Sequence, residues 1–279
     1  MGILNIVELK MVAHGDHVLD LKEYPFMASL HRKDPTTGKF KAQCGATILN
    51  QQWVLTAAHC VWKHIPYKNT LKVQAGTINS DPTKSGQMID VTKVIMHEGF
   101  VNKSGKTPQG SDFWFYNDIA VLKLKTKLTY GGQVGPAILV NNAKEKLWPA
   151  GQKATIMGWG YTNMFPVMMP SLLSAPMTAM SEKECTRQFP TDYMQLMICA
   201  SGFLRGPCPG DSGGPIAREY FSKKSGKFKN IQVGIISRGP GNCQYDNNEY
   251  AAFTDTYRFC GWIERIIGLD GICKRLEEI

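Results

Sequence analysis

The chain has 279 residues and a formal net charge of +9. This length allows one large all-β domain or two small ones, and it buries enough apolar surface to fold without covalent cross-links. No stretch approaches the ~18 apolar residues of a membrane helix, and no basic–aromatic run has a nucleic-acid motif spacing. We therefore expect no membrane and no nucleic-acid partner, and we interpret the positive charge as a solvated surface. The alternative is that the charge forms an exosite for acidic substrates.

The chain starts without a basic leader, and Asn5 and Glu8 interrupt its first apolar run, so no signal peptide is evident. It nevertheless carries 8 cysteines, an even number that indicates an oxidising compartment. No cysteine pair has the C-x-x-C spacing of a zinc site. We expect a secreted protein with disulfides, no metal and no cofactor.

Short alternating segments predict β-strands along most of the chain, with turn residues at the ~8–12-residue spacing of all-β barrels. Examples are residues 26–31, 72–76, 119–124, 153–157 and 232–236. Ser181 and Glu184 form a capping box, which predicts a short helix that contains Cys185. A last helix with apolar residues at helical spacing is expected from near Thr256 to Gly268.

Three separate segments carry side chains suited to acyl transfer. His59 follows a strand-like run and two alanines, Asp118 heads an alternating strand pattern, and Ser212 lies in a glycine-rich turn. A serine hydroxyl needs a base, a neutral imidazole can serve as that base, and a carboxylate fixes the imidazole's tautomer. Each residue alone is also typical of a packed core or a strand cap. Together, in these motifs, they predict a catalytic triad.

The glycines beside Ser212 predict a backbone anion site. Gly210 and Gly213 permit dihedrals and close approaches that a side chain would forbid. The N–H groups of Gly210 and Ser212 can then converge on the oxyanion of an acyl-transfer transition state. Pro209 removes one backbone N–H, but neither of these two.

These motifs resemble the chymotrypsin/trypsin family of serine endopeptidases, over most of the chain. Gly158-Trp159-Gly160 and Trp262 match further landmarks of the family. The resemblance implies an all-β fold of two six-stranded antiparallel β-barrels with the active site between them, plus a C-terminal helix. His59 and Asp118 would lie on the first barrel and Ser212 on the second.

The resemblance also divides the chain. Residues 1–10 are expected to be an N-terminal extension or propeptide, 11–268 the protease domain and 269–279 a C-terminal tail. Within the domain, the first barrel is expected over about 25–135 and the second over about 150–255. Residues 76–87 lack the pair of glutamates of the family's calcium loop, so no calcium site is expected.

By the same resemblance, His59 is the general base, Asp118 its orienting carboxylate and Ser212 the nucleophile, with Gly210 and Ser212 as oxyanion donors. Ser237 maps onto the strand that pairs with the substrate backbone. The resemblance implies three disulfides, Cys44–Cys60, Cys185–Cys199 and Cys208–Cys243. The two cysteines that remain, Cys260 and Cys273, are predicted to pair with each other.

Activation is implied at Asp211, which in the family forms a buried ion pair with a new α-amino group after proteolysis. The best cleavage candidate is the bond after Lys10, which would make Met11 the new terminus. Met11 and the residues after it depart from the family's Ile-Val-Gly-Gly.

The specificity pocket is predicted from spacing. Gly206 lies six residues before Ser212, where trypsin-like members carry the aspartate that binds Lys or Arg. A buried basic side chain would have no partner there, so we expect cleavage after aromatic or large aliphatic residues. An elastase-like preference for small residues is second, and an inward-pointing Glu249 would restore cleavage after basic ones. The other residues assigned to substrate binding are Pro207, Ser237, Arg238 (where most members have Trp), Gly239 and Ala251.

Two loops, residues 31–41 and 99–116, are longer than the family minimum, and Asn102 begins an N-glycosylation sequon. Trp114 belongs to an aromatic run, residues 113–116, that either packs under its loop or lines the substrate cleft.

The sequence as a whole predicts a monomeric, secreted serine endopeptidase that acts on proteins or peptides through an acyl-enzyme and is a target for protein inhibitors. The alternatives are a catalytically silent homologue that binds a partner through its cleft, and a cascade or venom protease with one narrow target.

Overall fold

The computed structural model describes residues 15–63, 70–104, 113–141, 147–161, 168–240, 243 and 250–279. Met11 and Glu249 lie outside these ranges. The strands are β1 (Asp16–His17), β2 (Met27–Lys33), β3 (Phe40–Ile48), β4 (Trp53–Thr56), β5 (Leu71–Ala75), β6 (Gln87–Met96), β7 (Val101–Ser104), β8 (Phe113–Tyr116), β9 (Ala120–Leu124), β10 (Leu139–Val140), β11 (Lys153–Gly158), β12 (Leu173–Ala179), β13 (Met197–Ser201), β14 (Pro215–Ser222), β15 (Lys227–Arg238), β16 (Tyr250–Asp255) and β17 (Cys273–Lys274). The helices are α1 (Glu182–Gln188), α2 (Thr191–Met194) and α3 (Thr256–Ile267), with 3-10 turns at Leu21–Glu23, Ala58–Cys60 and Leu276–Glu278.

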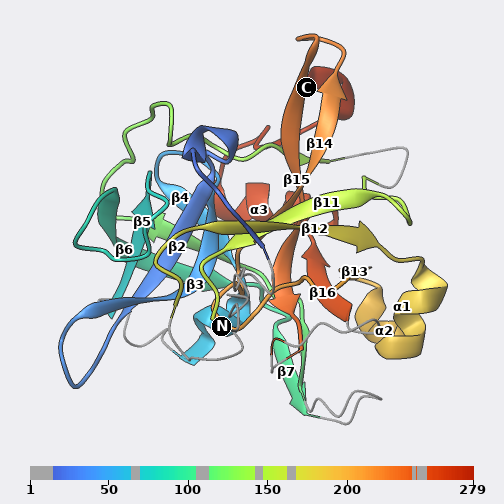
Figure 1. Cartoon of the computed structure of the whole chain (residues 1–279), viewed down its shortest axis with the longest axis horizontal. Helices are drawn as coiled ribbons and strands as arrows, with labels where there is room; N and C mark the ends of the chain where they lie inside the picture. The colour runs from blue at the N-terminus through green and yellow to red at the C-terminus, as the bar shows by residue number, and fades with distance from the viewer. Residues whose placement is uncertain are drawn as a thin grey trace, which may run out of the picture.

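The first barrel closes in the order β2-β3-β4-β9-β6-β5 (Figure 1). Its strands alternate as their sequence predicts: Ala28 and Leu30 of β2 belong to the apolar core, whereas the alternating residues Ser29 and His31 do not. Leu30 pairs with Cys44 on β3 and with Val73 on β5, so the inward side chains of the three strands lie directly opposite one another. Because side chains alternate with period two, this register places Ala28 and Leu30 on the face toward the barrel core. Met27, on the opposite face, packs in a separate apolar cluster with Leu21 and Phe26.

The second barrel is the ring β12-β11-β14-β15-β16-β13, which the pairing of β12 with β13 closes, and β1 adds to β12 at its edge. Its core is separate from that of the first barrel and contains Ile156, Ile216 and Phe253. The structure therefore confirms the expected architecture of two six-stranded antiparallel barrels and a C-terminal helix.

Two helices lie where the sequence indicates. The Ser181–Glu184 capping box opens α1. Asp255 caps α3 by accepting the Tyr257 N–H, and Gly268 ends it in the left-handed conformation with φ of 67°. The apolar side of α3 packs into the core of the first barrel, although the helix follows the second barrel in the chain.

One contact between the barrels is made by backbone alone. The Gly45 N–H on β3 donates to the carbonyl oxygen of Ser212 at 2.8 Å. A Cβ on Gly45 would lie 2.6 Å from the Cα of Gly214, a separation that real Cβ atoms do not show. Glycine is therefore required at position 45, because the two chains approach too closely for any side chain.

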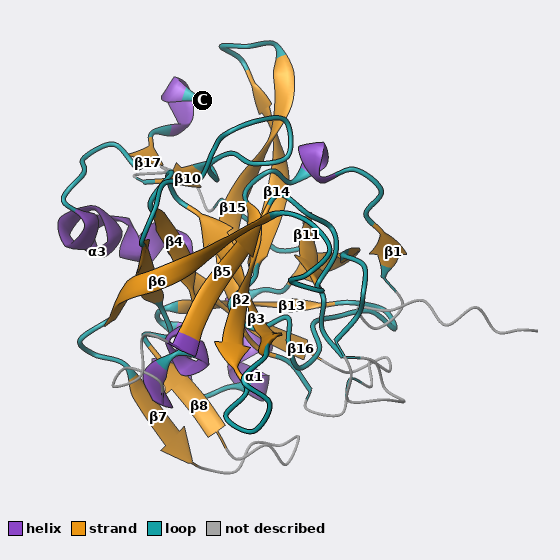
Figure 2. Ribbon diagram, turned by 90° about the vertical axis from the view of Figure 1, so that its left-hand side faces the viewer, coloured by secondary structure: helices purple, strands orange, loops and turns teal. Residues whose placement is uncertain are grey.

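All 8 cysteines are paired, and the pairs match those expected from the sequence: Cys44–Cys60, Cys185–Cys199, Cys208–Cys243 and Cys260–Cys273. Within the described ranges, no helix is long and apolar enough to cross a bilayer. Within the long loop before Asp118, β7 pairs with β8, and this β7–β8 hairpin projects from one end of the molecule (Figure 2).

Candidate active site

His59 is held in one orientation by Asp118. The imidazole Nδ1 lies 2.7 Å from Asp118 Oδ2, and the backbone N–H of His59 donates to Asp118 Oδ1 at 2.9 Å. His59 sits on a 3-10 turn just after β4, and Ala57 and Ala58 beside it are fully buried. A carboxylate partner at Nδ1 assigns the ring proton to that nitrogen, which leaves Nε2 free to accept a proton.

Asp118 is fully buried, and both barrels satisfy its polar atoms. Besides the two donors of His59, Oδ2 accepts the Ser237 hydroxyl at 2.6 Å, and the Asp118 carbonyl accepts the Thr254 hydroxyl at 2.9 Å. Asn117, just before it, takes a positive φ of 50° and donates its side-chain amide to the Gly99 carbonyl. A buried carboxylate is tolerated when its oxygens are hydrogen-bonded in this way.

Ser212 lies beside this pair in a tight turn. Its carbonyl oxygen accepts the Gly45 N–H and lies 3.6 Å from the Cys60 sulfur, next to His59 in the chain. Among the described residues the Ser212 hydroxyl makes no hydrogen bond to the His59 ring. Contacts of this kind are often long without substrate and tighten when it binds. Gly213 has φ of +79°, and a Cβ there would lie 2.2 Å from the Thr56 hydroxyl.

Two N–H groups of this turn are left unused within the described part of the chain. The N–H groups of Asp211, Gly213 and Gly214 donate to the carbonyls of Cys208, Ile236 and Asp211. Those of Gly210 and Ser212 make no such bond, and Gly210 takes a positive φ of 99°. They are the two donors that the sequence assigns to the oxyanion.

Asp211 points into the protein, away from solvent. Its side chain accepts the Gly160 N–H at 2.6 Å and the Cys208 N–H at 2.8 Å. Cβ atoms on Gly158 and Gly160 would lie 2.0 and 2.3 Å from its carboxylate oxygens, so this Gly-Trp-Gly segment is shaped around the carboxyl group. Burial raises the pKa of Asp211 to about 6, although the two backbone donors favour the ionised form. No cation among the described residues pairs with it.

The residues assigned to substrate specificity lie on the second barrel. Gly206, Pro207 and Ala251 are buried. Ser237 is buried as well, while Arg238 and Gly239 are half-buried at the end of β15, where Arg238 pairs with Ala252 of β16. The Cys208–Cys243 disulfide ties the segment that follows β15 to the segment before Ser212.

Two neighbours in the aromatic run before Asp118, Trp114 and Phe115, lie in different surroundings. Trp114 is only 8% exposed and packs with Cys185, Phe189 and Met194. Phe115 stacks on the His59 ring, with centroids 4.6 Å apart and planes 12° from parallel. The sequence did not single out Phe115, but strand alternation was the available signal, because neighbouring residues of β8 face opposite sides.

Metal binding gains no support from the described residues. One grouping among them has ligand atoms close enough for a metal ion, namely Cys44, His59 and Cys60. The two sulfurs are bonded to each other, and the imidazole faces Asp118.

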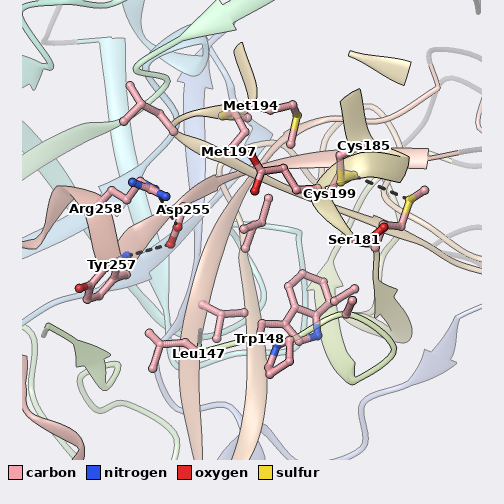
Figure 3. Close-up of a pocket in the computed structure, with 18 of the residues that line it drawn as sticks. Leu147, Trp148, Ser181, Cys185, Met194, Met197, Cys199, Asp255, Tyr257 and Arg258 are labelled. Atoms are coloured by element: carbon pink, nitrogen blue, oxygen red, sulfur yellow. Dashed lines mark hydrogen bonds and ion pairs between the residues drawn. A yellow bond between two sulfur atoms is a disulfide. The ribbon is translucent and has the colours of Figure 1, made fainter. Parts of the chain in front are cut away.

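The cavity in Figure 3, about 790 Å³ in volume, is separate from these residues. Its walls come from α1, α2, β13 and the start of α3, and they include Trp148, Met194 and Tyr257. None of His59, Asp118 and Ser212 lines it, so we assign no part of the reaction to it.

This fold and site define a serine endopeptidase, a hydrolase, and the comparisons with known proteins agree. The chain belongs to the trypsin family, whose sequence model matches residues 14–263. It is 33% identical over 231 residues to anionic trypsin of Bos taurus, covering 80% of this chain and 79% of that protein. It is 32% identical to serine protease 1 of Rattus norvegicus, with 80% of each covered, and 32% identical to trypsin of Sus scrofa, with 80% and 85% covered. Its substrates are therefore proteins or peptides, and its four disulfides fit an extracellular protein.

The two aromatic neighbours should respond differently to truncation. Trp114→Ala is expected to lower the free energy of unfolding by about 3–5 kcal/mol, as for a core aromatic residue, without changing the preference for peptide length. Phe115→Ala is expected to lower kcat/KM by up to about tenfold, because the imidazole loses its stacking partner. Urea unfolding and kcat/KM on a peptide series measure both, with Tyr116→Phe as a control that keeps the ring. A stable Trp114→Ala protein with altered length preference would contradict this division.

Asp211 should make the uncleaved chain less stable as pH rises. Its folded-state pKa of about 6 lies above the ordinary value of 3.8, so between these values the folded protein binds more protons than the unfolded chain. The free energy of unfolding therefore falls through this window, by up to about 3 kcal/mol. Asp211→Asn should remove this slope, while the exposed Asp270→Asn should keep it. Urea unfolding from pH 4 to 7 tests this, and parallel curves for Asp211→Asn and the wild type would contradict it.

Proposed function

We propose that Ser212 is the nucleophile of this endopeptidase, His59 its general base and Asp118 the group that orients the imidazole. The observation that carries the proposal is the 2.7 Å contact of His59 Nδ1 with a carboxylate that is otherwise fully satisfied. That contact leaves Nε2 as the proton acceptor, on the imidazole that lies beside the Ser212 turn.

The reaction then has two halves. Ser212 Oγ attacks the carbonyl carbon of the scissile bond, and its proton moves to His59 Nε2. The oxyanion is stabilised by the N–H groups of Gly210 and Ser212, which have no other acceptor among the described residues. His59 returns the proton to the leaving amine, which departs and leaves an acyl-enzyme. Water, deprotonated by His59, attacks the ester carbonyl. The ester bond to Ser212 Oγ then breaks, and His59 passes its proton to that oxygen, which releases the acid and restores Ser212.

Activation is proposed to follow cleavage after Lys10, with the new α-amino group of Met11 entering the site of Asp211. The support is the charge deficit there: a fully buried carboxylate has two backbone donors and no described cation. An ammonium group would stabilise the ionised form of Asp211 and hold the adjacent oxyanion N–H groups in place.

We also propose that the protein is secreted, because disulfides form in oxidising compartments.

Labelling with a fluorophosphonate tests the nucleophile and the activation site together. The wild type should be labelled only after proteolysis, and N-terminal sequencing of the labelled protein should begin at Met11. Ser212→Ala should lose the label and lower kcat by about a million-fold, whereas the exposed Ser225→Ala, on a distant hairpin, should retain both. An unlabelled protein after cleavage would favour a silent binding homologue. A labelled protein with another N-terminus would refute Met11 alone.

For specificity, we propose cleavage after aromatic or large aliphatic residues. The substrate backbone would pair with the end of β15, at Ser237, Arg238 and Gly239, and its side chain would enter beside Gly206, Pro207 and Ala251. None of these residues supplies a carboxylate, and both Gly206 and Ala251 are buried, so an inserted Lys or Arg would lack a counter-charge. The likeness to proteins named trypsin favours the competing preference, for basic residues.

Hydrolysis of matched peptides that differ in one residue decides between the two preferences. We expect kcat/KM for a Phe or Leu substrate to exceed that for Arg by about a hundredfold or more, since burying an unpaired charge costs ~3–5 kcal/mol. Gly206→Asp should raise the Arg rate relative to Phe, and Gly206→Ser should not. Best hydrolysis of an Ala substrate would indicate the elastase-like alternative. Efficient Arg cleavage with none of Phe or Leu would refute the proposal.

A further inference from the structure

The β14–β15 hairpin extends beyond the second barrel as a two-stranded arm (Figures 1 and 2). Its outer rungs pair Tyr220 with Lys229, Phe221 with Phe228, and Ser222 with Lys227. The connecting turn is ordered by its own hydrogen bonds. The Gly226 N–H donates to the Ser222 carbonyl at 2.8 Å, and the Ser225 hydroxyl donates to the Ser222 hydroxyl at 2.8 Å.

One face of this arm is covered by the protein itself. Tyr220 packs against the core of the second barrel, and Ser222 is buried where its hydroxyl donates to the carbonyl oxygen of Ile279. Lys229 on the same face also donates to that oxygen, at 3.3 Å. These contacts fix the arm against the C-terminal segment, so its tip is a firm projection.

The other face carries two aromatic rings in solvent. Phe221 is 49% exposed and Phe228 is 67% exposed, and their rings meet edge to face with centroids 5.3 Å apart. This ring pair takes no part in either barrel core. Two adjacent exposed aromatic side chains at the end of a projection are typical of a contact surface.

The tip is also strongly basic. Lys223, Lys224 and Lys227 are exposed, and none of them forms an ion pair within the described part of the chain. The neighbouring acidic residues do not cancel them. Glu277 and Glu278 are both engaged by Arg275, at 3.6 and 2.7 Å, and Glu219 lies two rungs below Phe221.

We propose that this tip docks on an anionic lipid surface, with Phe221 and Phe228 entering the headgroup boundary and the three lysines contacting acidic headgroups. Aromatic rings favour the bilayer interface, and lysines near an anionic leaflet add attraction for each charge. A soluble polyanion would use the lysines alone and leave both rings in water, so the ring pair favours a bilayer. The sequence did not predict a membrane partner, because the lysines form only short clusters until the hairpin brings them around the two rings.

Docking by this arm would leave the catalytic residues accessible. The β7–β8 hairpin, whose Phe115 stacks on His59, lies at the opposite end of the molecule in both views (Figures 1 and 2). A bilayer at one end and substrate at the other do not compete for the same surface.

Co-sedimentation of the full chain with vesicles tests the proposal. We expect the protein to bind phosphatidylcholine vesicles that contain phosphatidylserine, and not phosphatidylcholine alone. Lys223→Gln/Lys224→Gln/Lys227→Gln should weaken binding by about fivefold per lysine, and Phe221→Ala/Phe228→Ala by about tenfold or more. The matched controls are Lys33→Gln/Lys39→Gln/Lys93→Gln, also exposed lysines, and Phe203→Ala, which removes an exposed ring elsewhere; neither should weaken binding.

Two further measurements guard against a folding defect. Every hairpin variant should hydrolyse a small ester at the wild-type rate after activation, because the tip is remote from His59. Phe228→Trp should show a blue shift of its fluorescence, beyond that of the wild type, when phosphatidylserine vesicles are added. If the Phe221→Ala/Phe228→Ala variant fails to fold, this shift tests ring insertion in its place.

Three results would overturn the proposal. The first is equal binding to both vesicle types or to neither. The second is vesicle binding that the lysine variant loses and the phenylalanine variant keeps, with no blue shift for Phe228→Trp. The third is binding of a sulfated polysaccharide without any vesicle binding, which would indicate a polyanion as the partner.

Discussion

The buried carboxylate of Asp118 is the constraint on which the rest of the site depends. A buried negative charge is tolerated when its oxygens are hydrogen-bonded, and the donors come from both barrels: His59 from the first, Ser237 from the second. The Thr254 hydroxyl adds a bond from the second barrel to the Asp118 carbonyl. Sliding one barrel against the other would leave this charge unsatisfied, which costs several kcal/mol. The group that orients the imidazole thus also fixes how the two barrels dock.

The second joint between the barrels is a backbone contact, and it sets where the serine lies. Gly45 approaches Gly214 so closely that position 45 tolerates no side chain, and the Gly45 N–H fixes the Ser212 carbonyl. The Cys44–Cys60 disulfide joins the residues adjacent to Gly45 and His59, so one short cross-link relates the proposed base to the proposed nucleophile. Rigid backbone contacts of this kind hold reacting groups more precisely than flexible side chains could.

Much of this arrangement could be predicted from local sequence. Each of His59, Asp118 and Ser212 stands in a short motif whose neighbouring residues already indicate its chemistry. Strand alternation in turn predicts which side chains enter the barrel cores. Long-range register is harder to predict. Trp114 and Phe115 are neighbours in one aromatic run, yet the position of β8 beside α1 buries the first and turns the second toward His59. Likewise, Phe221 and Phe228 meet only because β14 and β15 pair in one register, which composition does not encode.

The division of the site between two barrels has a consequence for biosynthesis. A chain made from its N-terminus presents the imidazole and the acid early, while the alcohol and the residues that complete the carboxylate's shell, Ser237 and Thr254, emerge last. A ribosome-bound or truncated product that stops before residue 212 would hold the imidazole and the acid without the serine hydroxyl that we propose as their partner. Chain order alone would therefore keep such an unfinished molecule from completing the proposed triad.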